Sequence, residues 1–137
     1  MNVRHAWSVA AALVVAAGGC GAPRFVEVSG KLTHKGQPVP STQVTFMPDD
    51  GSRPSKGLTG DDGNFTLRYS RTQSGATRGP CTVFLTYVVS NEEELKQIPP
   101  KASKELKAVI NRYSDPKTSG LHVEIAKSGQ FVPVELE

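Results

Sequence analysis

The stretch from Val26 to Leu67 reads VEVSGKLTHKGQPVPSTQVTFMPDDGSRPSKGLTGDDGNFTL, and it decides the fold class. Short runs in which apolar and polar residues alternate are separated by clusters of Gly, Pro and Asp at close intervals. Alternation with a period of two is typical of a strand with one buried face. Several such strands with frequent turns are typical of an antiparallel β-sandwich, so the stretch predicts an all-β fold.

The alternation also predicts which side chains point inward. Strands are expected at 25–33, 41–48, 56–60 and 64–70, with Gln43 and Thr45 on an outer face. The residues expected to point inward are Val26, Val28, Leu32, Val44, Phe46, Phe65, Leu67 and Tyr69. Gly36 supplies the positive φ of a turn after His34, and Gly60-Asp61-Asp62-Gly63 predicts a tight hairpin.

Three further strands are expected towards the carboxyl end. The run 81–90 is apolar on both faces, as a central strand would be. Strands at about 121–126 and 131–136 alternate, and Pro133 makes the last one an edge strand because proline lacks a backbone donor. The residues expected to point inward are Leu121, Val123, Ile125, Val132, Val134 and Leu136.

A helix is predicted from Lys101 to Tyr113, where the period changes. Its apolar stripe consists of Leu106, Val109, Ile110 and Tyr113. Its outer face carries the basic residues Lys101, Lys104, Lys107 and Arg112. A helical turn is also expected at Glu92–Leu95, stopped by Pro99-Pro100. We interpret the basic face as solvated. Contact with anionic lipid headgroups or with acidic envelope polymers is the functional alternative.

The first residues have the pattern of a secretory signal. Met1–His5 includes Arg4, the run from Ala6 to Ala17 is apolar, and Gly18-Gly19 closes it with small residues. This apolar run is too short for an ordinary transmembrane helix. Residues 1–19 are therefore predicted to be a signal peptide, with ordinary cleavage near the same place as the alternative to the lipoprotein type.

Cys20 follows that exit directly, and Ala17-Gly18-Gly19-Cys20 resembles the lipobox of bacterial lipoproteins, with Ala17 where the family usually has Leu. The resemblance implies lipid on the Cys20 thiol, cleavage before this residue and an acylated amino terminus, often carrying palmitate. It also implies a membrane-anchored lipoprotein of the bacterial cell envelope, facing the periplasm or the exterior. Residues 20–24 would be the tether, which is too short to be a stalk.

The rest of the chain, 25–137, resembles the carboxypeptidase regulatory-like domain, a transthyretin-like, prealbumin-type module. The residues that carry this resemblance are Gly30, Gly36, Pro38, Val44, Phe46, Asp62, Gly63 and Phe65. The run RYSDPKTSGLHVEI at 112–125 resembles the closing segment of small bacterial lipoproteins built on that domain. The resemblance implies a single seven-strand antiparallel Ig-like sandwich with a short helical insertion. The family is named for its fold, so no activity follows from it.

The two cysteines have different expected roles. If Cys20 carries lipid it cannot form a disulfide, and Cys81 is then an unpaired thiol in a dense β run. We interpret Cys81 as a small buried hydrophobic residue, because no neighbouring cation in the sequence would activate it. A Cys20–Cys81 disulfide is the alternative if the lipobox interpretation is wrong.

The residue types of a catalytic triad occur together at Ser114, Asp115, Ser119 and His122. Triads are assembled in space, no G-x-S-x-G elbow is present, and alternation places His122 on an outer face. Hydroxyisourate hydrolases share the transthyretin-like fold, but their Tyr-Arg-Gly-Ser end is replaced here by Val-Glu-Leu-Glu. We therefore expect no catalytic residue.

We expect no metal site and no cofactor. His34 and His122 are far apart in the sequence, and His5 would be lost with the signal. Asp49-Asp50-Gly51 and Asp61-Asp62-Gly63 lack the alternating ligands of a calcium loop and are explained as turns.

Length and charge complete the prediction. The 137 residues suggest one domain, and 16 basic against 13 acidic side chains give a net charge of +3. We expect a non-catalytic binding or adhesion module, with a purely structural lipoprotein and a small hydrolase or small-ligand binder as alternatives. The membrane is the expected partner through lipid on Cys20, and a protein or acidic polymer partner is left open. No nucleic acid is expected, because interleaved aromatic residues are missing, and we expect a monomer.

Overall fold

The computed structural model describes residues 24–88 and 100–137, with side chains from residue 104 onward in its helix. The signal peptide, Cys20 and the helical turn expected at Glu92–Leu95 lie outside the described residues. The strands are β1 (Phe25–Val26), β2 (Val28–His34), β3 (Gln37–Pro38), β4 (Thr42–Pro48), β5 (Ser55–Leu58), β6 (Asn64–Thr66), β7 (Ala76–Thr77), β8 (Gly79–Tyr87), β9 (Leu121–Ile125) and β10 (Gln130–Leu136). The helix is α2 (Pro100–Arg112).

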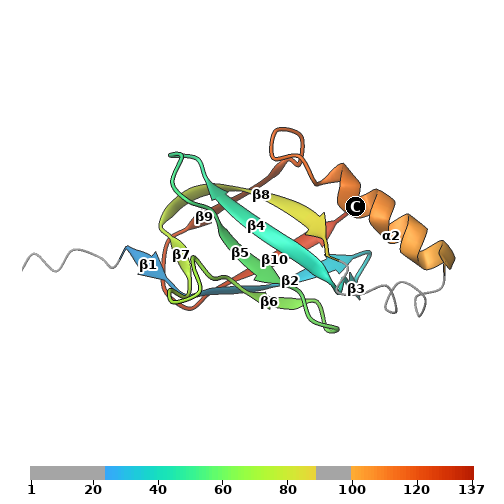
Figure 1. Cartoon of the computed structure of the whole chain (residues 1–137), viewed down its shortest axis with the longest axis horizontal. Helices are drawn as coiled ribbons and strands as arrows, with labels where there is room; N and C mark the ends of the chain where they lie inside the picture. Colours follow the sequence, from blue (N-terminus) through green and yellow to red (C-terminus); the bar gives the residue numbers. More distant parts are fainter. Residues whose placement is uncertain (1–23, 89–99) are drawn as a thin grey trace, which may run out of the picture.

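Two four-stranded sheets face each other and enclose the core (Figure 1). One sheet has the order β5-β4-β8-β9, and the other is formed by β10, β2, β3 and β6. The all-β sandwich predicted from the sequence is confirmed. The described residues contain more strand segments than the seven expected strands, because short pieces such as β1 are separated from longer ones by single residues or turns.

Strand pairing is antiparallel throughout the described sheets with one exception, the parallel pair of β10 and β2. The chain enters β10 from β9 of the opposite sheet, so no hairpin imposes an antiparallel direction on it. Two predictions about strand position are confirmed. Strand β8 is central, between β4 and β9, and Pro133 lies on the edge strand β10.

The core contains almost all of the side chains that alternation assigned to it. Phe46 and Phe65 are buried and belong to different sheets, and their ring centroids lie 6.1 Å apart. Two expectations need correction. Thr45 is buried although it was expected outside, because it lies on the central part of the sheet between β5 and β8. Tyr69 is only half-buried, since it lies beyond the end of β6. Leu121 and Val123 do point inward and pack against the core, and they are half-buried because β9 lies at the sheet edge.

The two predicted turns form, but they do different things. Lys35 and Gly36 both have positive φ, 49° and 78°, which is the geometry of the tight hairpin that joins β2 and β3. At the second turn Gly63 donates a hydrogen bond to the Gly60 carbonyl (2.9 Å) and has a φ of 76°. This turn was expected to close a hairpin. The flanking segments do pair antiparallel at Lys56 and Arg68, but the strands themselves part, and the turn carries the chain from β5 in one sheet to β6 in the other.

Helix α2 packs its apolar stripe on the sandwich, as the sequence predicts. Val109 and Ile110 are buried, and Leu106 and Tyr113 pack against the same core. The Tyr113 carbonyl accepts a hydrogen bond from the Leu85 amide of β8 (2.9 Å). The helix begins at Pro100, and proline is well suited to a first helical turn because an amide there would have no partner.

The two ends of the sandwich differ. Strand β1 lies at one end of the long axis, where the described chain begins, and α2 lies at the other end (Figure 1). We call these the entry end and the helix end. No helix in the described part of the chain combines the length and the hydropathy needed to cross a membrane.

Candidate functional site

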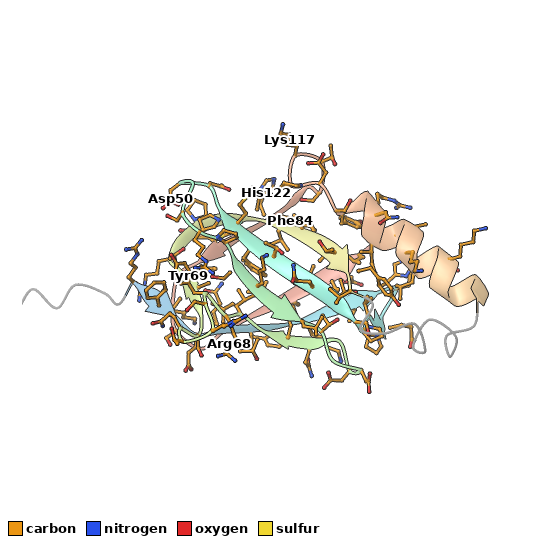
Figure 2. All side chains as sticks on the ribbon, viewed as in Figure 1. Asp50, Arg68, Tyr69, Phe84, Lys117 and His122 are labelled. Carbon is orange, nitrogen blue, oxygen red and sulfur yellow. The ribbon has the colours of Figure 1, made fainter. Side chains whose placement is uncertain are left out.

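A groove of about 520 Å³ lies on the surface towards the entry end. Its lining carries four cationic side chains and no carboxylate. We call it the basic groove, and its lining residues are Arg53, Pro54, Lys56, Arg68, Tyr69, Ser70 and Arg71. Figure 2 shows Arg68 and Tyr69 in the half of the molecule that holds β1, away from α2.

The crossing between the sheets brings two of these cations together. Lys56 of β5 and Arg68, just beyond β6, form an antiparallel bridge with reciprocal backbone hydrogen bonds of 3.0 and 2.9 Å. Residues directly opposite each other in such a bridge project their side chains from the same face. Both side chains are exposed, so two cationic side chains leave neighbouring backbone positions on the same surface. Like charges in this arrangement repel and cost stability.

The loop that follows Tyr69 is held in place by its own hydrogen bonds. The Ser70 hydroxyl accepts the amides of Thr72 (3.3 Å) and Gln73 (3.0 Å), and the Gln73 carbonyl accepts the amide of Tyr69 (2.9 Å). The Arg68 guanidinium donates to the Arg71 carbonyl (2.8 Å). These contacts hold residues 68–73, which form one side of the groove, in a defined conformation.

A row of aromatic rings and guanidinium groups connects the groove to the start of the domain. The rings of Phe25 and Tyr69 lie 4.7 Å apart between centroids. Arg53 lies over the Tyr69 ring at 5.5 Å, and Arg24 lies over the Phe25 ring at 5.8 Å. Contacts of cations with ring faces are favourable and hold guanidinium groups in defined positions. The groove is therefore tied to the residue at which the tether meets the sandwich.

Cys81 is buried on β8, where it is paired with Pro48 of β4. Burial raises the pKa of its thiol to about 11, and the carboxylates of Asp49 and Asp50 add to the increase. A thiol with a raised pKa carries little thiolate at neutral pH, which fits the interpretation of Cys81 as a buried hydrophobic residue.

The candidate triad is not assembled. Ser114 donates to the Asn111 carbonyl (2.7 Å), and the Asp115 carboxylate accepts the Lys117 amide (2.8 Å). Ser119 accepts the Leu121 amide (3.4 Å). Each of these side chains therefore makes a local hydrogen bond in the segment between α2 and β9.

His122 is exposed and has a different neighbour. Its Nδ1 lies 3.5 Å from the Thr82 hydroxyl, which donates to Asp49 (3.0 Å). The sequence analysis did not predict that Asp49, Thr82 and His122 lie together, because they come from three distant stretches of the chain. Figure 2 shows His122 on the outer face of the sheet that contains β8.

The aspartate pairs also act as turn residues. The Asp50 carboxylate accepts the Ser52 amide (2.8 Å), and hydrogen bonds from Ser52 lower the pKa of Asp50. The Asp62 carboxylate accepts the backbone and side-chain amides of Asn64 (3.0 and 2.7 Å), which lower the pKa of Asp62. Across the described side chains, no three His, Cys, Asp or Glu residues are grouped as a metal site would require.

The basic face of α2 lies at the helix end. Lys104 is exposed, Lys107 lies over the Tyr87 ring at 5.5 Å, and Arg112 donates to the Glu137 carbonyl (3.1 Å). The sequence analysis found these cations because they share one helix. It missed the basic groove, whose cations are separated by up to 18 positions and show no periodicity.

No family model and no curated protein matches the sequence. The chain is similar to a solved structure of a DUF3823 family protein from Parabacteroides merdae, with 17% sequence identity and a TM-score of 0.45. The similarity covers 82% of this chain and 45% of that one. The chain thus corresponds to less than half the length of that protein.

Proposed function

We propose that this chain is an exported, lipid-anchored β-sandwich module that binds an anionic component of the bacterial cell envelope without catalysing a reaction. Lipid on Cys20 attaches it to the membrane, and the basic groove holds the anionic group. In this proposal the sandwich is a carboxypeptidase regulatory-like domain, which fits a module whose loops and surfaces carry the function.

One observation carries the proposal, the pairing of Lys56 directly opposite Arg68. Such a pair is unfavourable in the free domain, because like charges face each other without a carboxylate in the groove lining. An anion bound between the two side chains would turn this repulsion into attraction. Sequences depart from local stability rules mainly where function requires it, so the pair points to a bound anion.

The lining chemistry suits binding better than catalysis. Arg53, Arg68 and Arg71 offer planar guanidinium groups, and Tyr69 and Ser70 add hydroxyls. Guanidinium groups pair with phosphate or carboxylate through two parallel hydrogen bonds. Nucleophilic catalysis would instead need a nucleophile with a base in reach, and the lining supplies neither histidine nor carboxylate.

The groove is tested with inorganic polyphosphate as a soluble probe. The chain from residue 20 onward with Cys20→Ser is titrated by calorimetry, alone and with Lys56→Gln/Arg71→Gln. We expect the groove variant to bind at least about tenfold more weakly, because charge-assisted hydrogen bonds are lost. The control, Lys104→Gln/Lys107→Gln, removes the same charge from α2 and should bind within about threefold of the parent. Equal weakening of both variants would contradict the proposal.

The anchor is tested separately in bacterial cells. The full chain should sediment with membranes and partition into detergent, because a thioether-linked lipid contributes a large apolar area. Cys20→Ser should abolish lipid labelling and move the domain to the soluble fraction or leave the signal uncleaved. If both forms distribute in the same way and neither takes up labelled fatty acid, Cys20 is not the anchor.

A further inference from the structure

We infer that the basic groove binds the phosphate-bearing headgroups of anionic lipids in the membrane that holds the chain, so that the entry end of the sandwich lies against this membrane. The inference rests on the proposed anchor at Cys20, and it names the ligand of the proposed groove. Its basis is the position of the groove relative to the start of the domain.

The groove lies close to the anchor because it contacts the first strand. Tyr69 lines the groove and packs on Phe25, with ring centroids 4.7 Å apart. Phe25 is the fifth residue after Cys20. Five residues span at most about 18 Å when fully extended. Even an extended tether would therefore keep Phe25 and its neighbours within about two nanometres of the lipid on Cys20.

The chemistry of this end suits a layer of lipid phosphates. Arginine pairs with phosphate through two hydrogen bonds, and Arg53, Arg68 and Arg71 surround the groove. Tyr69 is half-buried and presents an aromatic ring with a polar tip, which is the type of side chain enriched at membrane interfaces. Arg24 adds a cation at the entry itself, over the Phe25 ring.

The opposite end of the molecule provides a control. Helix α2 also carries exposed lysine, yet it lies at the far end of the long axis from β1 (Figure 1). A domain held at its entry end would present the groove to the headgroups and hold α2 away from them. General attraction of a basic protein to an anionic surface would instead involve both ends about equally.

Vesicle sedimentation tests this orientation. The chain from residue 20 onward with Cys20→Ser is mixed at low salt with phosphatidylglycerol–phosphatidylcholine vesicles, and in parallel with pure phosphatidylcholine. Each basic residue near an anionic surface strengthens binding about fivefold, so Lys56→Gln/Arg71→Gln should weaken partitioning roughly 25-fold. Lys104→Gln/Lys107→Gln should weaken it by less than about threefold. Binding should also weaken with added salt, because an exposed surface is screened.

Each variant is first checked for unchanged thermal unfolding, and Arg53→Gln/Arg71→Gln replaces the first groove pair if that pair does not fold. Equal losses in the groove and helix variants, or a larger loss in the helix variant, would overturn the inference. Equal binding to phosphatidylcholine would overturn it as well. Groove-dependent binding of polyphosphate without binding to vesicles would overturn the inference and leave the proposed function standing. Failure with both probes would remove both.

Discussion

The helix end and the entry end of the sandwich both carry cations, but they use them differently. On α2, Lys107 lies over the Tyr87 ring and Arg112 donates to the Glu137 carbonyl. The groove has the same two kinds of contact, because Arg53 lies over the Tyr69 ring and Arg68 donates to the Arg71 carbonyl. In the basic groove, Lys56 and Arg68 face each other across a bridge in a lining without a carboxylate. What sets the groove apart is this pair of cations, whose repulsion a bound anion would relieve.

This difference shows that a cluster of cations does not by itself indicate a binding site. The groups that lie next to each cation must also be known. The two regions carry similar numbers of cations, four in the groove lining and four on α2. What distinguishes the groove is that strand pairing places Lys56 directly opposite Arg68 in a lining without a carboxylate, whereas α2 carries Glu105 among its cations. If the comparison is right, removing the groove cations should mainly weaken anion binding, and removing the exposed cations of α2 should change binding and stability little. Mutations in the buried stripe of α2 should lower stability.

The largest expected effect is at Ile110, the most deeply buried residue of α2. Ile110→Ala should lower the free energy of unfolding by roughly 2–5 kcal/mol, because it removes buried methyl groups and leaves a cavity. Urea unfolding followed by circular dichroism measures the change. The matched control on the same helix is Lys104→Ala, which should stay within about 0.5 kcal/mol because Lys104 is exposed. A loss below about 1 kcal/mol at Ile110 would mean that α2 does not stabilise the sandwich, and the comparison would fail.

The fold was largely predictable because its signals are local. Alternation in Val26–Leu67 and in 121–136 identified the buried faces, and glycines marked the turns. The exceptions have non-local causes. Thr45 is buried because β5 and β8 flank β4, and β10 is parallel to β2 because it arrives from the other sheet. The alternation pattern of one strand does not show which strands pair with it, or whether they run parallel or antiparallel to it.

The candidate site was not predictable for the same reason. Arg53 precedes β5, Arg68 and Arg71 follow β6, and only the crossing between the sheets places them together. The sequence around Gly60–Gly63 signals a turn, but it does not reveal that the turn changes sheets. The helix cations were found because a single helix displays its period in the sequence. Cys20 remains a prediction, since it lies outside the described residues.

A smaller effect is expected at Tyr69, where the entry end is held to β1. Tyr69→Ala should cost roughly 1 kcal/mol, because the pair with Phe25 is lost and an aromatic pair contributes about 0.5–1.5 kcal/mol beyond its buried area. Tyr69→Phe keeps both rings and should unfold at the same urea concentration as the parent. If Tyr69→Phe is as unstable as Tyr69→Ala, the hydroxyl and not the ring pair holds the groove to β1.

The smallest effect concerns how far the electrostatic field of the groove cations extends into the core. The pH dependence of stability that comes from Cys81 measures this. Burial and the carboxylates of Asp49 and Asp50 raise the pKa of the Cys81 thiol from 9.0 to about 11. The stability that comes from the protonated thiol is therefore complete below pH 9 and is lost as the pH rises through about 11. Two proteins that both carry Cys20→Ser are compared, one with Cys81 and one with Cys81→Val. The difference between their unfolding free energies should be constant up to pH 9. Between pH 9 and pH 11 the protein with Cys81 should lose stability relative to Cys81→Val.

No groove cation is among the causes of the raised pKa, so the same pH dependence is expected when Lys56→Gln/Arg71→Gln is present in both proteins. A loss that moves to higher pH in that variant would mean that the groove cations had been stabilising the thiolate. The positive field of the entry end would then extend into the core, and the groove could not be treated as a surface site alone.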